Sequence, residues 1–169
     1  MSFFQDRRRL NLLGFAACAL LLGYAYFYAE KFLHLEPCPL CMFQRVGVAA
    51  MGLVFLSAAI HHPVSQTGAR FYAWLIFLVA LFPGYVAGRH VYIQSLPPGS
   101  VPSCGATLDF MMEVFPLMEV VRKVLTGGGE CAKIDWQFLG LSMPAWVLIA
   151  VVGLAVAGIL VNARKIITK

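Results

Sequence analysis

Charged residues are scarce in this sequence: only 12% of its 169 residues are Asp, Glu, Lys or Arg, whereas 60% are hydrophobic. Soluble domains carry about 25% charged and roughly 45–50% apolar residues, so this balance excludes an ordinary soluble protein. The formal net charge of +5 needs no nucleic acid as a partner, because membrane proteins carry excess Lys and Arg next to their spans. The composition indicates an integral protein of the lipid bilayer.

Charge is almost absent from four apolar stretches, which cover about residues 10–29, 42–60, 71–88 and 145–161. Each is close to the roughly 17–25 residues with which a helix crosses a bilayer. We therefore predict an all-α membrane protein, a single domain over residues 1–169 built as a bundle of four transmembrane helices. The first stretch lacks a small-residue cleavage site, so we expect it to be retained and not removed as a signal peptide. The spans carry no acid or base between their ends, which disfavours an ion pathway.

The basic residues indicate how the four spans are oriented. With four spans both termini share one side, and the short segments on that side hold seven of the 13 Lys and Arg residues. The other side holds six, spread over more chain and accompanied by seven of the eight acids. The positive-inside rule then predicts cytoplasmic termini, with the segments at about 30–41 and 89–144 on the opposite side.

Cysteine is also rare, and this topology separates the five cysteines into two groups. Cys18 lies in the middle of the first span, where we interpret it as a small buried apolar residue. The other four lie on the non-cytoplasmic side: Cys38, Cys41, Cys104 and Cys131. An even set in an oxidising compartment is expected to be paired.

The stretch "EPCPLCMFQRVG" places Cys38 and Cys41 at the start of the second span. Pro39 suits the first position of a helix, so Cys41 falls in the first turn, where exposed backbone N–H groups favour a thiolate. Arg45 follows one turn later on the same face and offers a cation to that sulfur. The alternative for Arg45 is that its side chain reaches the lipid headgroups.

Prolines and glycines surround Cys104 in the second outer segment, and three glycines precede Cys131, so we expect both cysteines on irregular, mobile chain. Between them, "TLDFMMEVFPLMEVVRKVL" spaces its polar residues as a helix lying in the membrane interface does. We predict a short interfacial helix there. It either contacts a substrate or acts as a simple covering lid.

A second metal-binding knuckle is missing. A lone C-x-x-C also occurs in zinc sites and copper carriers, but Cys104 and Cys131 stand 27 positions apart. An oxidising compartment disfavours free thiolates as well. We therefore predict no metal site, and interpret His34 and His90 as residues that flank spans.

Three features together resemble one family of bacterial membrane proteins: "CPLCMFQR" at the second span, the loop cysteines, and "DWQFLGLSMPAW" before the fourth span. The chain resembles the disulfide bond formation protein B family, DsbB, over nearly its whole length. The vitamin K epoxide reductase family also joins loop cysteines to a C-x-x-C, but there the C-x-x-C follows the loop pair. Gln44 stands where some DsbB members carry an acid, so we assign it no role in proton transfer.

The resemblance implies a thiol:quinone oxidoreductase in the bacterial inner membrane, with periplasmic cysteines and either ubiquinone or menaquinone as the cofactor. A thioredoxin-like partner, DsbA, would exchange with Cys104 of a Cys104–Cys131 disulfide, and Cys131 would then attack Cys38. Cys41 would be left as a thiolate beside the quinone, with Arg45 and His90 bordering it. Two alternatives remain: a membrane scaffold or transporter with static disulfides, and a cysteine-based metal carrier.

Overall fold

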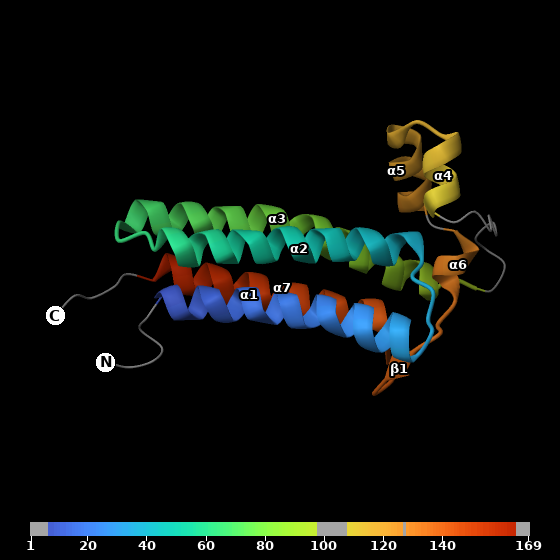
Figure 1. Cartoon of the computed structure of the whole chain (residues 1–169), viewed down its shortest axis with the longest axis horizontal. Coiled ribbons are helices and arrows are strands. Elements are labelled where there is room, and N and C mark those ends of the chain that lie inside the picture. Colours follow the sequence, from blue (N-terminus) through green and yellow to red (C-terminus); the bar gives the residue numbers. More distant parts are fainter. Residues whose placement is uncertain (1–6, 98–107, 127, 165–169) are drawn as a thin grey trace.

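The computed structural model describes residues 7–97, 108–126 and 128–164. Four long helical rods lie side by side in it (Figure 1). They are α1 (Arg7–Gly23) continued by the π-helix η2 (Tyr24–Phe32), α2 (Pro39–His61), α3 (Gln66–Gln94) and α7 (Met143–Ala163). All four are long and apolar enough to cross a membrane. The predicted four-helix bundle is therefore confirmed, and each rod extends beyond the apolar stretch that predicted it.

The starts of the helices follow local sequence signals. Pro39 begins α2 after Cys38, whose backbone is extended (φ −68°, ψ 161°), because a proline at the first position loses no helical hydrogen bond. Ser65 caps α3, since its hydroxyl accepts a hydrogen bond from the Gly68 backbone N–H at 3.1 Å. The C-x-x-C is thus held at a helix start that the sequence itself specifies.

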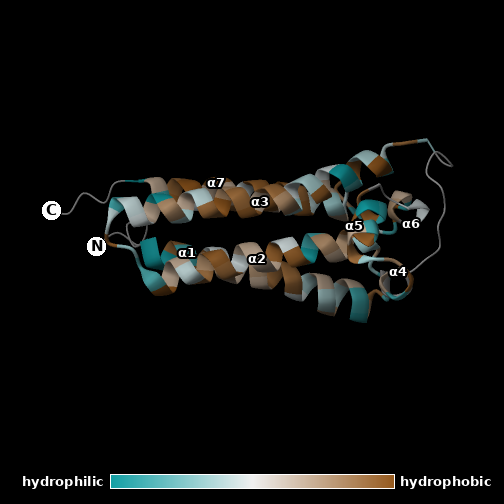
Figure 2. Ribbon diagram, turned by 90° about the horizontal axis from the view of Figure 1, so that it is seen from above, coloured by the Kyte–Doolittle hydropathy of each residue, from teal (hydrophilic) through white to brown (hydrophobic). Residues whose placement is uncertain are grey.

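The core of the bundle depends on glycines that let helices approach closely. The Phe55 ring of α2 lies between two of them, and a Cβ on Gly14 or Gly158 would meet that ring at 2.7 or 2.8 Å. Cys18 is 1% exposed and packs in the same cluster, which confirms its interpretation as a core residue. The four long helices consist mostly of hydrophobic residues (Figure 2). Many of their large hydrophobic side chains are exposed, as a lipid-facing surface requires.

Polar side chains close the end of the bundle where the first helix begins. The buried amides of Asn11 and Asn162 donate to each other's oxygen at 3.1 and 2.9 Å. The Arg7 guanidinium donates to the Pro63 carbonyl at 3.1 Å and the Arg164 carbonyl at 2.9 Å. These contacts join α1, the turn after α2 and the end of α7.

The opposite end carries the short elements: α4 (Leu108–Val114), α5 (Leu117–Thr126), α6 (Gly129–Ala132), and the hairpin of β1 (Gln137–Phe138) and β2 (Leu141–Ser142). The strands are antiparallel, with Gln137 opposite Ser142. The hairpin turn places Leu139 and Gly140 at positive φ (51° and 77°), as a tight two-residue hairpin loop requires.

The single helix predicted between the loop cysteines is two helices, α4 and α5. Pro116 separates them, because it has no N–H to donate to the preceding turn. Its own carbonyl accepts from Glu119 and Val120, so it starts α5. The placement of these helices in the membrane interface remains a prediction.

Candidate functional site

The two cysteines of the C-x-x-C face each other at the start of α2. Their Sγ atoms are 3.2 Å apart, and both side chains are partly buried. Leu40, which lies between them, is fully buried, so the turn is anchored in the protein. Two thiols this close exchange readily between dithiol and disulfide once an oxidant is present.

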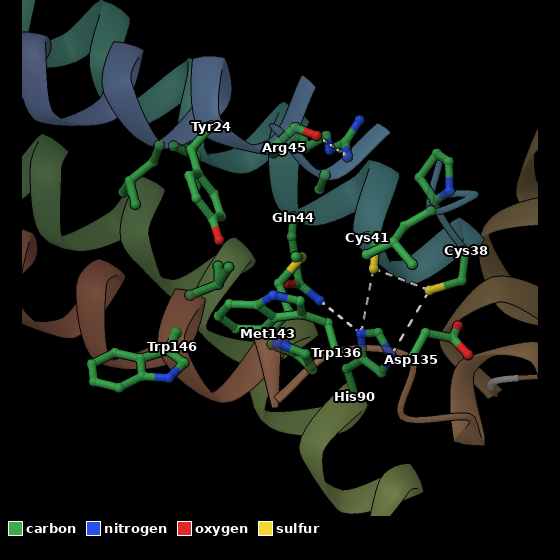
Figure 3. Close-up of a pocket in the computed structure, with 18 of the residues that line it drawn as sticks. Tyr24, Cys38, Cys41, Gln44, Arg45, His90, Asp135, Trp136, Met143 and Trp146 are labelled. Carbon is green, nitrogen blue, oxygen red and sulfur yellow. Dashed lines mark hydrogen bonds between the residues drawn. The ribbon is translucent and has the colours of Figure 1, made fainter. Parts of the chain in front are cut away.

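His90 of α3 lies against both sulfurs. Its Nε2 is 3.8 Å from Cys38 Sγ, and its Nδ1 is 4.0 Å from Cys41 Sγ. Nε2 also lies 3.1 Å from the Cys131 carbonyl, and Nδ1 lies 3.0 Å from the Gln44 side-chain amide. Because a carbonyl only accepts, Nε2 carries the proton and Nδ1 accepts from Gln44. His90 is 2% exposed, so these contacts hold its ring in one orientation (Figure 3).

The contact with Gln44 was missed from the sequence, where this residue received no role. Gln44 is 4% exposed and follows Cys41 by three positions on α2, so the two side chains share a helix face. That spacing is the signal that could have linked Gln44 to the site.

Cys131 lies in the short helix α6 and is buried, so the prediction of irregular, mobile chain at this cysteine was wrong. Its Sγ, Cys38 Sγ and a ring nitrogen of His90 all lie within 4.8 Å of one another. The hydrogen bond with Cys38, together with burial, raises the pKa of the Cys131 thiol, so the thiol is uncharged at neutral pH. Cys104, the fourth predicted cysteine, lies outside the described residues.

Three side chains at the end of α3 hold the Cys131 segment by its backbone. Besides His90, Arg89 donates to the Leu125 carbonyl at 3.2 Å, and Gln94 donates to the Lys133 carbonyl at 3.3 Å. Because the bonds go to carbonyl groups, they fix the path of the segment whatever its side chains are. This path places Cys131 beside the C-x-x-C.

Arg45 has a partner that the sequence did not reveal. Its Nη1 forms an ion pair with the Glu30 carboxylate, and its Nη2 donates to the Ala25 carbonyl at 3.2 Å. Both partners belong to the π-helix η2, and π-helical turns occur often at functional sites. Arg45 and Glu30 are 21% and 19% exposed, so the pair is shielded from bulk solvent without being sealed off.

These groups line one wall of a cavity of about 460 Å³. Cys38, Cys41, Arg45 and His90, all predicted as site residues, lie on it. The other walls are largely apolar or aromatic and include Leu21, Leu22, Tyr24, Ala29, Val48, Trp136, Met143, Pro144, Trp146 and Val147 (Figure 3). Small-molecule sites of about 300–1,000 Å³ typically combine such walls with a few polar groups.

The aromatic walls were also missed from the sequence, although "DWQFLGLSMPAW" contains two of them. The β1–β2 hairpin positions these rings: Trp146 Nε1 donates to the Phe138 carbonyl at 3.1 Å, and the Phe138 ring stacks 6.2 Å from that of Trp136. Tyr24 of η2 lies edge-on to Trp136 at 6.4 Å. Their role depends on this hairpin, which hydropathy does not reveal.

Thiols from two distant parts of the chain therefore meet beside an apolar cavity, at one end of a bundle that can cross a membrane. The site and the fold together define a membrane-embedded oxidoreductase that exchanges disulfides.

Comparison with known proteins identifies the family. The family model described as "Disulfide bond formation protein DsbB" matches residues 7–161. A disulfide bond formation protein B from Methylococcus capsulatus is 52% identical over 153 residues, covering 90% of this chain and 92% of the relative. A protein of the same name from Acinetobacter baumannii is 50% identical, and the match covers 80% of this chain and 80% of the relative. Another from Hahella chejuensis is 48% identical, and the match covers 90% of this chain and 92% of the relative. The chain belongs to the DsbB family. It is a multi-pass membrane protein and an oxidoreductase that acts in disulfide bond formation.

Proposed function

We propose that this protein reoxidises a periplasmic thioredoxin-like dithiol oxidase, DsbA, and passes the electrons to membrane quinone. The observation that carries the proposal is that Cys131 lies beside Cys38, and that Cys38 and Cys41 line the wall of an apolar cavity. A scaffold with static disulfides would gain nothing from a cavity beside its sulfurs. The proposed sites are the four cysteines with Arg45 and His90.

The proposed route is a series of thiol–disulfide exchanges. A thiolate of the reduced partner attacks Cys104 of a Cys104–Cys131 disulfide, and Cys131 leaves as a thiolate. Cys131 attacks Cys38 of a Cys38–Cys41 disulfide, which forms a Cys38–Cys131 bond and releases Cys41 as a thiolate. The second thiol of the partner resolves the mixed disulfide at Cys104, and the partner leaves oxidised by two electrons. The freed Cys104 then attacks Cys131, which restores the Cys104–Cys131 bond, releases Cys38 and leaves both electrons on the Cys38–Cys41 dithiol beside the cavity.

The docked position of Cys131 supports the second exchange. Burial of the Cys131 side chain, which contributes to its raised pKa, disfavours the charge of a thiolate arriving there. Thiols of high pKa are also the stronger nucleophiles once ionised. Bond formation with Cys38 moves the negative charge from Cys131 to Cys41, near Arg45, so both effects favour transfer of electrons toward the cavity.

The cavity suits the final acceptor. Quinone, when bound, accepts two electrons and two protons. The apolar walls exclude water, so charges on the wall interact strongly. Arg45 balances negative charge that develops at Cys41, Glu30 and Ala25 hold the guanidinium at the wall, and His90 borders the same space.

The function can be tested with purified protein and a reduced DsbA-type partner. Quinone absorbance should fall in step with partner oxidation, one quinone per disulfide formed, with ubiquinone and menaquinone analogues supplied separately. Cys104→Ser should abolish the reaction, whereas Cys18→Ser should not change it, because Cys18 packs in the core. Partner oxidation without quinone consumption would contradict the proposal, and disulfides that persist without quinone would favour the static scaffold.

We propose that both termini are cytoplasmic and that residues 30–41 and 89–144 of this single domain face the periplasm of the bacterial inner membrane. The side chains of Leu117 and Met118 in α5 are 72% and 81% exposed. In this orientation they would contact the membrane interface. A reporter enzyme that is active only in the periplasm should work when fused after Leu96 and fail when fused after Thr67. The reverse pattern would overturn the orientation and the redox route with it.

A further inference from the structure

Four side chains around His90 have the chemistry of a zinc site. Cys38, Cys41 and Cys131 supply sulfur, and His90 supplies a ring nitrogen. Cys38 Sγ lies 3.2 Å from Cys41 Sγ and 3.8 Å from His90 Nε2, whereas Cys41 Sγ lies 4.0 Å from the other ring nitrogen, Nδ1. Cys131 lies within 4.8 Å of both Cys38 and His90.

The Cys38–Cys41 and Cys38–Nε2 separations are close to the edges of a zinc tetrahedron. Bonds of about 2.3 Å to sulfur and about 2.0–2.1 Å to nitrogen place neighbouring ligand atoms roughly 3.3–3.8 Å apart. Cys38, Cys131 and His90 already lie within 4.8 Å of one another, and a turn of the Cys41 side chain from Nδ1 toward Nε2 would complete the set of four. The sequence prediction counted Cys104 as the fourth possible ligand, but His90 occupies this place between the sulfurs (Figure 3).

We propose that the fully reduced protein binds one Zn²⁺ through Cys38, Cys41, Cys131 and His90, and that the bound ion inhibits disulfide exchange. The three thiols release their protons on binding. A cysteine sulfur that is part of a disulfide cannot bind the ion as a thiolate. Zn²⁺ binding and the disulfide-bonded states of the protein therefore exclude each other. The site itself is inferred from the geometry of the side chains. Accumulation of the reduced form in the cell, when an electron acceptor is scarce, rests on the proposed function.

Gln44 supplies the support that a zinc-binding histidine needs. A ligating imidazole donates its other ring N–H to a fixed oxygen. With Nε2 on the ion, Nδ1–H would donate to the Gln44 amide oxygen, after the buried amide turns from its present contact at 3.0 Å. The Cys131 carbonyl gives up its hydrogen bond with Nε2 in exchange.

The cavity provides a path for the ion. Cys38, Cys41 and His90 line it, and so do the exposed acids Glu36 and Asp135, opposed by Lys133 and Arg45. The acids offer carboxylates on the way from solvent to the thiols. The ion therefore reaches the site without unfolding of the helices.

The test uses the full protein in detergent, without quinone or partner, either reduced by a phosphine or fully oxidised. Co²⁺ serves as the spectroscopic probe, and Zn²⁺ affinity is measured by displacement of Co²⁺ and by competition with a chromophoric chelator. We expect one Co²⁺ per reduced protein, with intense tetrahedral visible bands and thiolate charge-transfer bands in the near ultraviolet. The oxidised protein should give neither set of bands.

The variants assign the ligands. Cys131→Ser and His90→Ala should each weaken Zn²⁺ binding about 100-fold or more, and Gln44→Ala about tenfold, the range for loss of a supporting hydrogen bond. Cys104→Ser, Cys18→Ser and His34→Ala should bind as the unsubstituted protein does. Loss of binding in Cys104→Ser would replace His90 by Cys104 as the fourth ligand and overturn this site.

Two further outcomes would overturn the proposal without any variant: equal Zn²⁺ affinity of the reduced and oxidised proteins, or Co²⁺ binding without thiolate bands. Inhibition is measured as the rate at which reduced protein reacts with a small aromatic disulfide, and saturating Zn²⁺ should lower it at least tenfold. An unchanged rate would refute the inhibitory role. None of these measurements involves quinone, so failure of the proposed quinone chemistry would leave the metal result intact.

Discussion

The two ends of the helical bundle use polar side chains in opposite ways. Asn11 and Asn162 form a reciprocal amide pair at one end, and Arg7 donates to two backbone carbonyls beside it. At the other end His90 lies within 4.0 Å of two sulfurs, an amide and a carbonyl at once. In the first arrangement each amide of the pair has a fixed hydrogen-bond partner. In the second, the His90 ring can interact with several neighbouring groups.

This difference separates stability from chemistry within one small bundle. Polar groups with fixed partners lock neighbouring helices together in an apolar environment. Groups with competing partners change partners at small cost, which disulfide exchange requires. Substitutions at the two ends should therefore affect different measurements.

The largest effect is expected from Arg45→Ala at the cavity end. It removes the cation at the cavity wall and leaves Glu30 without its partner. We expect the apparent quinone KM to rise about five- to 900-fold, equivalent to about 1–4 kcal/mol. Quinone absorbance kinetics measure this, and Arg45→Lys should be intermediate because it keeps the charge and loses the planar fork. Unchanged quinone kinetics in a folded Arg45→Ala protein would remove Arg45 from the mechanism.

A second prediction concerns the close helix contact at Phe55. Gly158→Ala places a methyl group 2.8 Å from the Phe55 ring, so the packed core must shift. The free energy of unfolding should fall by about 1–3 kcal/mol, measured by denaturation in mild detergent. Gly153→Ala is the matched control in the same helix, because nothing lies within 4 Å of its Cβ. Equal stability of the two variants would show that the glycine contact is not needed.

The smallest effect is expected from the amide pair. Asn162→Leu leaves the buried Asn11 amide without its partner and should lower the free energy of unfolding by about 0.5–2 kcal/mol. The quinone KM should stay as it is. Replacing both residues by Leu should recover part of the loss, because no polar group is then left unsatisfied. A changed KM in Asn162→Leu would break the separation between the two ends.

Hydropathy predicted the four helices well because a bilayer imposes length and apolarity on any helix that crosses it. It could not predict how each helix is rotated about its axis, since lipid-facing and buried residues are equally apolar. The Glu30–Arg45 and Gln44–His90 contacts depend on that rotation, and so does the Asn11–Asn162 pair. All three were therefore missed.

The site residues were predicted by two different routes. The Cys38–Cys41 pair and the position of Arg45 one turn later follow from local spacing, which the structure keeps. The relation of Cys131 to Cys38 followed only from resemblance to the DsbB family, because glycine-rich chain carries no signal for a distant contact. Three donors at the end of α3 determine where that chain lies, and their partners are carbonyl groups, which every residue has.

The π-helix η2 makes chain length part of the site. Each residue added to or removed from a helix rotates everything beyond it by about 100°, and the wide π-turns of η2 set the angle between Ala25 and Glu30, which both contact Arg45. Deleting one residue between them would leave every remaining side chain chemically unchanged, yet would turn one of the two contacts away from the guanidinium. In this segment the number of residues is as strict a requirement as their identity, so a one-residue deletion is expected to do more harm than most substitutions.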